Sequence, residues 1–145
     1  MISDEYIAGF LDADGSVSLQ KERSHLEEWN RKPVVEFYNT DMGILQQIQV
    51  KYGGALRQPK KQKKHHTQPN VLRLTNRKAM HLLLRVEPHM LHSKKKMRAS
   101  LIIEHYDDCT PKNGKYDQDT IDRKMILVER VMGIQMRSVS FGGMS

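Results

Sequence analysis

The 145-residue sequence has a single cysteine, Cys109, and no apolar run near the length of a membrane span. A lone cysteine cannot form an intrachain disulfide or a thiolate metal cluster, which excludes a disulfide scaffold and a cysteine-ligated zinc fold. A bilayer span needs about 20 consecutive apolar residues. Asp4 and Glu5 stand where a signal peptide carries positive charge. We therefore expect a soluble, intracellular protein without a targeting presequence or a membrane partner. It would act where it is translated, in a bacterial or phage-infected cytoplasm or in an organelle.

Acidic residues are the scarcer charge. The chain has 17 Asp and Glu against 24 Lys and Arg, which gives a net charge of +7 and a pI near 9.6. An excess of this sign favours a polyanionic partner over an acidic-protein partner. Apolar residues make up 38% of the chain, enough for a modest core. The length predicts one domain over residues 1–135, with 136–145 as a flexible tail.

Hydrophobic periodicity predicts alternating helices and paired strands. Val17 and Leu19 share one face of a half-buried strand, and Ser18 and Gln20 share the other. The predicted helices cover 3–15, 41–52, 77–86, 93–106 and 117–132, and the predicted strands cover 16–21, 34–39, 55–58 and 71–75. The segment 23–32 is expected to be a polar turn region. Short polar loops between consecutive strands favour an α+β fold, with a four-stranded antiparallel sheet covered by helices on one face.

The uncovered face of this sheet carries mostly polar and cationic side chains, which suits nucleic-acid binding. Its candidate DNA-binding residues are Ser18, Gln20, Lys21, Glu36, Tyr38, Arg57 and Arg73. Arg57 and Arg73 can read guanine in the major groove, whereas Gln20 can read adenine. Trp29 and Tyr38 can stack on bases, although such rings more often pack within a protein.

A strongly basic loop follows the third predicted strand. It offers four candidate phosphate-binding lysines, Lys60, Lys61, Lys63 and Lys64. Lysines that meet phosphates add affinity without sequence information. The alternative is a solvated surface loop or a localisation signal.

Two acids close the first predicted helix. Asp12 and Asp14 stand at its C-terminal end, where the helix dipole disfavours a carboxylate by about 0.3–1 kcal/mol. They make sense as ligands of a hard divalent cation, with Gly15 letting the backbone approach closely. An EF-hand is excluded because Val17 and Arg23 occupy its glycine and carboxylate positions. The alternative is a structural Asx-type turn.

The same helix carries small residues four positions apart. Gly9 and Ala13 leave one face nearly bare, so that a second helix can pack at close range. That helix belongs either to a second copy of the chain or to the chain itself.

The segment Ile7–Gly15 reads IAGFLDADG. It resembles the signature of the LAGLIDADG homing endonucleases, with swaps among apolar residues at its first, fourth and fifth positions. The resemblance implies an αββαββα fold over about residues 3–106, with a saddle-shaped antiparallel sheet, helices on one face and additional C-terminal helices. It also implies a homodimer joined through Ala8, Gly9, Asp12 and Ala13.

The resemblance further implies the roles of several residues. Asp14 would hold a catalytic Mg²⁺ (or Mn²⁺), beside Gly15, whereas Asp12 matches a helix-terminating position and ranks second as a ligand. Asn39 occupies the place of a residue, usually glutamine, that organises the attacking water. Lys94 or Lys95 would supply the basic group that helps the reaction.

We therefore expect a site-specific homing endonuclease that hydrolyses double-stranded DNA at a long pseudo-palindromic site, in intron or intein mobility. One alternative is a group I intron maturase or RNA-binding splicing factor, with intron RNA as its partner. Another is a DNA-binding protein of the same fold that does not cleave. A general architectural nucleic-acid binder would explain the charge but would leave Asp14 without a role.

Overall fold

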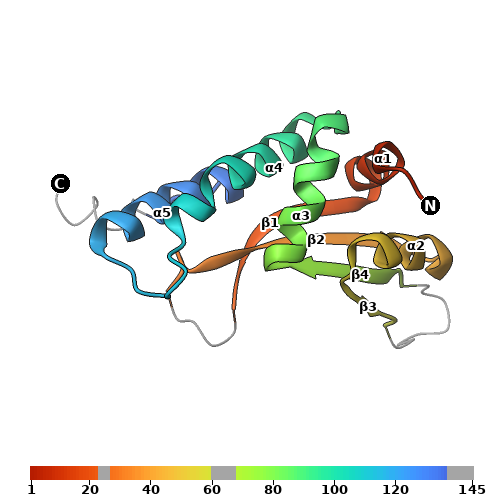
Figure 1. Cartoon of the computed structure of the whole chain (residues 1–145), viewed down its shortest axis with the longest axis horizontal. Coiled ribbons are helices and arrows are strands. Elements are labelled where there is room, and N and C mark those ends of the chain that lie inside the picture. The colour runs from red at the N-terminus through yellow and green to blue at the C-terminus, as the bar shows by residue number, and fades with distance from the viewer. Residues whose placement is uncertain (23–26, 60–67, 137–145) are drawn as a thin grey trace.

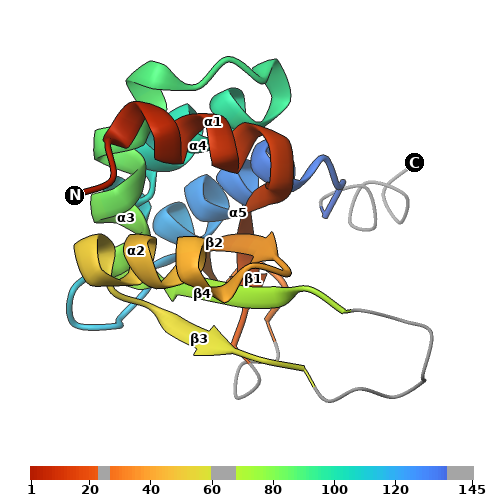
Figure 2. The same ribbon diagram turned by 90° about the vertical axis from the view of Figure 1, so that its right-hand side faces the viewer.

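The structure, a computed structural model, describes residues 1–22, 27–59 and 68–136. Helices cover one face of a four-stranded sheet, and none of the residues in these ranges covers the other face (Figures 1 and 2). The elements are α1 (Asp4–Asp14), β1 (Gly15–Lys21), β2 (Arg31–Asn39), α2 (Met42–Tyr52), β3 (Ala55–Arg57), β4 (Asn70–Thr75), α3 (Asn76–Val86), η1 (Glu87–His89), α4 (Ser93–His105), η2 (Asp107–Cys109) and α5 (Gln118–Met132). The predicted phosphate-binding residues Lys60, Lys61, Lys63 and Lys64 lie outside the described residues, as does the predicted tail beyond Met136.

The predicted α+β fold class is confirmed. The strands are antiparallel in the order β1-β2-β4-β3. Ser3 caps α1, because its Oγ accepts a hydrogen bond from Tyr6 N at 3.1 Å. No helix among the described residues is long and apolar enough to cross a bilayer.

The core lies between α1 and the helix-facing side of the sheet. Ile7 and Leu11 of α1 are fully buried, as are Leu19, Phe37 and Leu72 of three neighbouring strands. Burying side chains of this size contributes about 1.5–3 kcal/mol each. This packing fixes the position of α1 on the sheet, and with it the position of the two acids at its end.

The start of β2 differs from the prediction. Part of the segment expected to be a turn is strand, since β2 begins at Arg31 and pairs with β1 through Pro33, opposite Leu19. Leu19 N donates to Met132 Sδ instead of to β2. Leu19 and Pro33 are therefore a non-hydrogen-bonded pair of the β1–β2 ladder. The β4 ladder begins only at Val34. Pro33, which has no N–H, therefore costs the sheet no hydrogen bond there.

The C-terminal helices cover the edge strand β1. Arg98 Nη1 of α4 donates to Val17 O at 3.2 Å, and Met132 Sδ of α5 accepts from Leu19 N at 3.3 Å. An uncovered edge strand is a template for unwanted pairing. Helices α4 and α5 therefore shield the edge of the sheet as well as extending the core.

Candidate nucleic-acid interface and catalytic end of α1

Asp14 is the last residue of α1 and lies exposed at the surface. Among the residues that the structure describes, no group donates a hydrogen bond or forms an ion pair with its carboxylate. A hollow of about 420 Å³ adjoins it, which is lined by Glu5, Tyr6, Gly9, Phe10, Asp14 and Asn39. The structure thus brings together two of the predicted catalytic residues, Asp14 from the end of α1 and Asn39 from the end of β2.

Asp12 has a structural contact. Its Oδ2 accepts a hydrogen bond from Leu91 N at 2.7 Å, which ties the end of α1 to the segment before α4. Its Oδ1 is buried and has no hydrogen-bond partner among the described residues. This geometry supports the helix-terminating role, and the role of Asp12 as a metal ligand stays a prediction.

Lys95 and Lys94 have different surroundings. Lys95 Nζ donates to Leu11 O at 3.1 Å and to Asp12 O at 2.7 Å, so it caps the C-terminal end of α1. Lys94 is exposed, and nothing in the described parts of the chain pairs with its amine. Lys95 therefore positions the helix end that carries Asp14, and Lys94 is available to a ligand.

The Lys95→Met variant should have a free energy of unfolding lower by about 1–3 kcal/mol, because two helix-end carbonyls lose a charged donor. Lys94→Met should change it by less than about 0.5 kcal/mol. Urea unfolding of both variants beside the parent chain gives these values. Equal losses in the two variants would contradict the assignment.

Gly15 lets β2 approach the junction of α1 and β1. A Cβ there would lie 2.6 Å from Leu11 Cδ1 and 2.9 Å from Glu36 O. The backbone of Gly15 is extended, with φ −129°. Space, rather than a special backbone angle, is therefore what this position requires.

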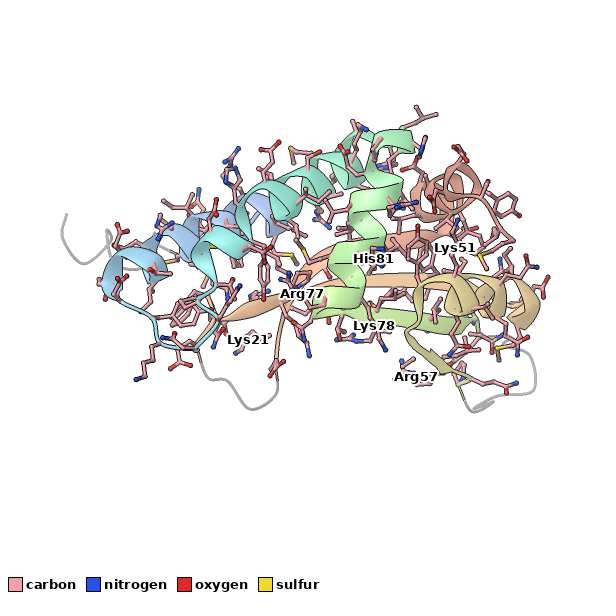
Figure 3. The ribbon with its side chains drawn as sticks, in the orientation of Figure 1. Lys21, Lys51, Arg57, Arg77, Lys78 and His81 are labelled. Carbon is pink, nitrogen blue, oxygen red and sulfur yellow. The ribbon has the colours of Figure 1, made fainter. Side chains whose placement is uncertain are left out.

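The uncovered face of the sheet contains a groove of about 510 Å³. It is lined by Gln20, Lys21, Glu36, Ala55, Arg57, Val71 and Arg73. Figure 3 shows Lys21 and Arg57 on this underside, away from the helices. Five of the predicted DNA-binding residues therefore line one groove.

Glu36 joins two other predicted residues within this face. Its carboxylate accepts from Tyr38 Oη at 3.0 Å and from Arg73 Nη1 at 3.4 Å. Burial, together with the adjacent Glu36 charge, raises the pKa of Tyr38. Tyr38 and Arg73 are thus held by one carboxylate, which sets their directions before any ligand binds.

Three of the candidate nucleic-acid-binding side chains already have contacts within the chain. Ser18 lies on the uncovered face but is only 7% exposed, because Gln20 folds back and donates to its Oγ at 3.0 Å. Lys21 borders the groove while its Nζ pairs with Glu28 at 2.9 Å. Trp29 packs edge-on against Tyr116 at 4.8 Å, as a structural residue would.

The residues that α1 exposes are not all those predicted for the dimer interface. Ala8 is fully buried in the chain's own core, so it cannot contact a partner. Tyr6 is 56% exposed, Ala13 is exposed, and a Cβ at Gly9 would meet nothing within 4 Å. The spacing of Tyr6, Gly9 and Ala13 places them on one side of the helix, a signal that could have added Tyr6 to the predicted interface.

The chain alone supplies few ligands for a metal. The described residues contain no cluster of three or more His, Cys, Asp or Glu side chains that could hold an ion. In the hollow, Asp14 is the carboxylate at the sheet end of α1, and Glu5 lies in the first turn. A divalent cation at Asp14 would therefore take its further oxygen ligands from water, from a second copy or from phosphate.

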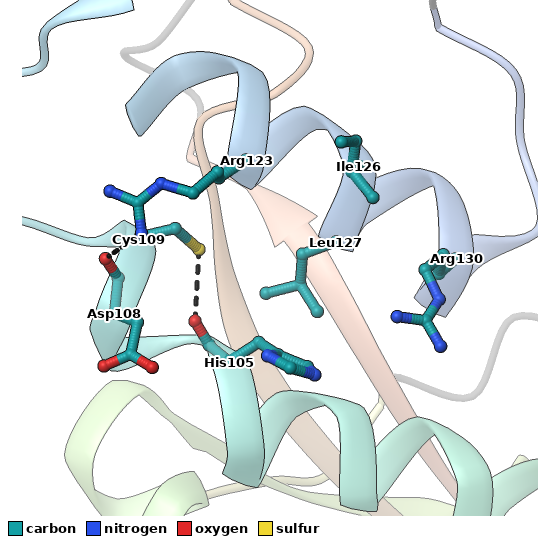
Figure 4. A pocket seen from close by; sticks show the side chains of 7 residues that line it. All are labelled: His105, Asp108, Cys109, Arg123, Ile126, Leu127 and Arg130. Atoms are coloured by element: carbon teal, nitrogen blue, oxygen red, sulfur yellow. Dashed lines mark hydrogen bonds between the residues drawn. The ribbon is translucent and has the colours of Figure 1, made fainter. Parts of the chain in front are cut away.

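A separate hollow of about 250 Å³ lies between η2 and α5 (Figure 4). Its thiol and one guanidinium are already paired, since Cys109 Sγ donates to His105 O at 3.3 Å and Arg123 Nη1 donates to Asp108 O at 3.1 Å. Burial raises the pKa of the Cys109 thiol, which disfavours the reactive thiolate.

No protein-family model and no curated protein matches the chain. Solved structures do. The homing endonuclease I-CvuI, in complex with the I-CreI target, superposes with a TM-score of 0.70 at 17% identity, covering 92% of this chain and 82% of I-CvuI. The homing endonuclease I-TnaI gives 0.66 at 15%, covering 89% and 87%. The LAGLIDADG homing endonuclease I-GzeII, in complex with a DNA target, gives 0.69 at 16%, covering 98% of this chain and 49% of I-GzeII.

The chain therefore has the fold of the LAGLIDADG homing endonucleases, as the IAGFLDADG segment predicted. It spans about half the length of I-GzeII.

Proposed function

We propose that two copies of this chain form a site-specific, metal-dependent DNA endonuclease of the LAGLIDADG class. The observation that carries the proposal is the placement of Asp14. Its carboxylate, which pairs with no group of the described residues, stands at the end of α1, in one hollow with Asn39 and beside the bare Gly9 side of the helix. The likeness to I-CvuI with its target, and to an archaeal intron-encoded homing endonuclease complexed with DNA, supports this reading.

Asp14 is the residue that would hold a divalent cation, Mg²⁺ or Mn²⁺, with Gly15 keeping the backbone close. When bound, such an ion activates water and stabilises negative charge on a phosphate. Like charges from two Asp14 carboxylates near a dyad would repel unless cation and phosphate share the site. The donor chemistry of Asp14 therefore suits a divalent cation that is shared with a DNA phosphate.

Asn39 and Lys94 supply the remaining polar groups. Asn39 Oδ1 accepts from Asp41 N at 2.8 Å, which leaves its amide N–H groups to orient a water or a phosphate oxygen. The exposed Lys94 would place positive charge near the phosphate that is cut.

The uncovered sheet face would bind the duplex. Arg57, Arg73 and Gln20 line its groove and can read base edges. A two-fold dimer reads two related half-sites, so the target would be long and pseudo-palindromic. Such a double-strand cut fits intron or intein mobility.

The alternative is a protein of this fold that binds DNA or intron RNA without cleaving, including a maturase. Asn39 favours it, because asparagine is one methylene shorter than the glutamine usual at this place, and its Oδ1 already serves the turn before α2.

The test starts from duplexes that the full chain selects out of a randomised DNA library. With Mg²⁺ we expect double-strand cleavage of the selected duplex, and with a chelator binding without cleavage. The logarithm of affinity should fall with the logarithm of salt by about 0.9 per phosphate contact. Tight binding to DNA or intron RNA without cleavage in Mg²⁺ or Mn²⁺ would move the assignment to the alternative.

A further inference from the structure

A smaller pocket lies at the end of the sheet opposite to α1. Its volume is about 110 Å³, and it is bordered by Glu22, by Arg31 and Lys32 of β2, by Asn76 of α3 and by Lys124 of α5. The seven residues of β1 separate this end from Gly15, a distance of about 20 Å along the strand.

Lys124 is a buried cation in this pocket. The residue is 1% exposed, and its Nζ donates to Tyr116 Oη at 2.6 Å. Nζ also lies 5.1 Å and 4.9 Å from the ring centres of Tyr106 and Tyr116. No carboxylate among the described residues forms an ion pair with it, and burial lowers its pKa to about 8. The hydrogen bond and the two rings offset part of the cost of burying this amine, and an anion in the pocket would offset more of it.

Other groups at the pocket also carry positive charge. Arg31 and Lys32 add two cations, each of which also contacts a glutamate, Glu28 and Glu22 respectively. The N-terminal end of α3 opens at Asn76, and its N-cap residue, Thr75, makes no side-chain capping hydrogen bond. Three cations and a positive helix end therefore lie at the pocket, against the two carboxylates of Glu22 and Glu28 that pair with Lys32 and Arg31.

We propose that this pocket binds a phosphate group, held by the ammonium of Lys124 and by the cations of β2. The volume suits one tetrahedral oxyanion and is too small for a nucleotide. The group could belong to the DNA backbone beyond the sheet groove or to a free anion. The first source rests on the proposed function and would extend the DNA footprint by one fixed phosphate contact, whereas the second stands without it.

Protonation of Lys124 then controls binding. The groups next to its amine are Tyr106, Tyr116 and Cys109, and the other charged groups of the pocket are Arg31, Lys32 and Glu22. Burial raises the pKa of Tyr106 to about 12 and raises those of Tyr116 and Cys109. Lys124 is therefore the group that loses charge first as pH rises. Affinity for sulfate, whose own charge is constant in this range, should fall as pH increases from 7 to 9.

The experiment measures the melting temperature of the full chain against low sulfate concentrations, with chloride keeping the ionic strength constant. Sulfate should stabilise the parent chain and the Lys115→Met control, whose lysine lies outside the pocket. Lys124→Met should bind sulfate about tenfold more weakly, the effect of losing one charged donor. Lys32→Gln, at the rim, should weaken it less and serves if Lys124→Met does not fold. The proposal would be overturned if sulfate stabilised both pocket variants as much as the parent chain. It would also be overturned if sulfate stabilised the parent chain no more than chloride does.

Binding to the selected duplex then separates the two sources. If the phosphate is that of DNA, Lys124→Met lowers the salt slope by about 0.9 on a full-length duplex and leaves binding to an end-trimmed duplex unchanged. If it is a free anion, both duplexes bind both proteins alike while the sulfate effect is lost. A protein that binds sulfate at Lys124 but cuts no DNA would contradict the proposed function alone.

Discussion

Asp14→Asn should lower Mg²⁺-supported cleavage at least about a thousandfold, the equivalent of about 4 kcal/mol of transition-state stabilisation. An amide keeps the size of the side chain but loses the charge that holds a divalent cation. Because Asp14 makes no hydrogen bond or ion pair within the described residues, the fold should lose nothing. Single-turnover cleavage of the selected duplex measures the rate, and urea unfolding checks the fold.

The matched control is Glu104→Gln, which makes the same chemical change at an exposed position near the end of α4. It should cut at the parent rate. Asp14→Asn should still bind the duplex, since the sheet groove is untouched. Cleavage by Asp14→Asn within tenfold of the parent rate would remove Asp14 from the reaction.

Gly9→Leu should break the dimer without harming the single chain. A Cβ at Gly9 meets nothing within 4 Å, and leucine favours helix over glycine by about 0.5–1 kcal/mol. Where two helices are in close contact, however, overpacking costs about 1–3 kcal/mol per side chain. A two-fold dimer carries the substitution in both copies, so the cost to association is twice as large. The dimer should therefore weaken by about a hundredfold or more.

Sedimentation equilibrium measures that association, and urea unfolding should show a Gly9→Leu chain at least as stable as the parent. Gly9→Ala, with one added methyl group, should have an intermediate effect. Unchanged association of Gly9→Leu would place the interface elsewhere on the molecule.

Much of the fold could be predicted because local patterns agree with the global structure. The alternation of Val17 and Leu19 runs along a strand, and α1 begins directly after a serine that caps it. The start of β2 was missed because Pro33 weakens the strand pattern. Only the pairing with β1 and the early end of β4 make a proline acceptable there.

The candidate site was predicted less completely, because long-range contacts decide it. Asp14 and Asn39 do meet in one hollow. The sequence could not distinguish Lys94 from Lys95, since the difference is a pair of hydrogen bonds to carbonyls more than 80 positions away. It also could not show that Ala8 faces the core or that Gln20 covers Ser18. Lys124 looks in the sequence like an ordinary surface lysine of an amphipathic helix.

Oxidative crosslinking of a Gly9→Cys chain tests most directly whether two α1 helices meet across a dyad. The native Cys109 does not compete, since its thiol is buried with a raised pKa. We predict a disulfide-linked species of twice 16.9 kDa, formed rapidly by Gly9→Cys and not by an exposed control, Lys115→Cys. If Gly9→Cys stays a monomer under oxidation while its thiol is freely alkylated, the two helices do not meet there.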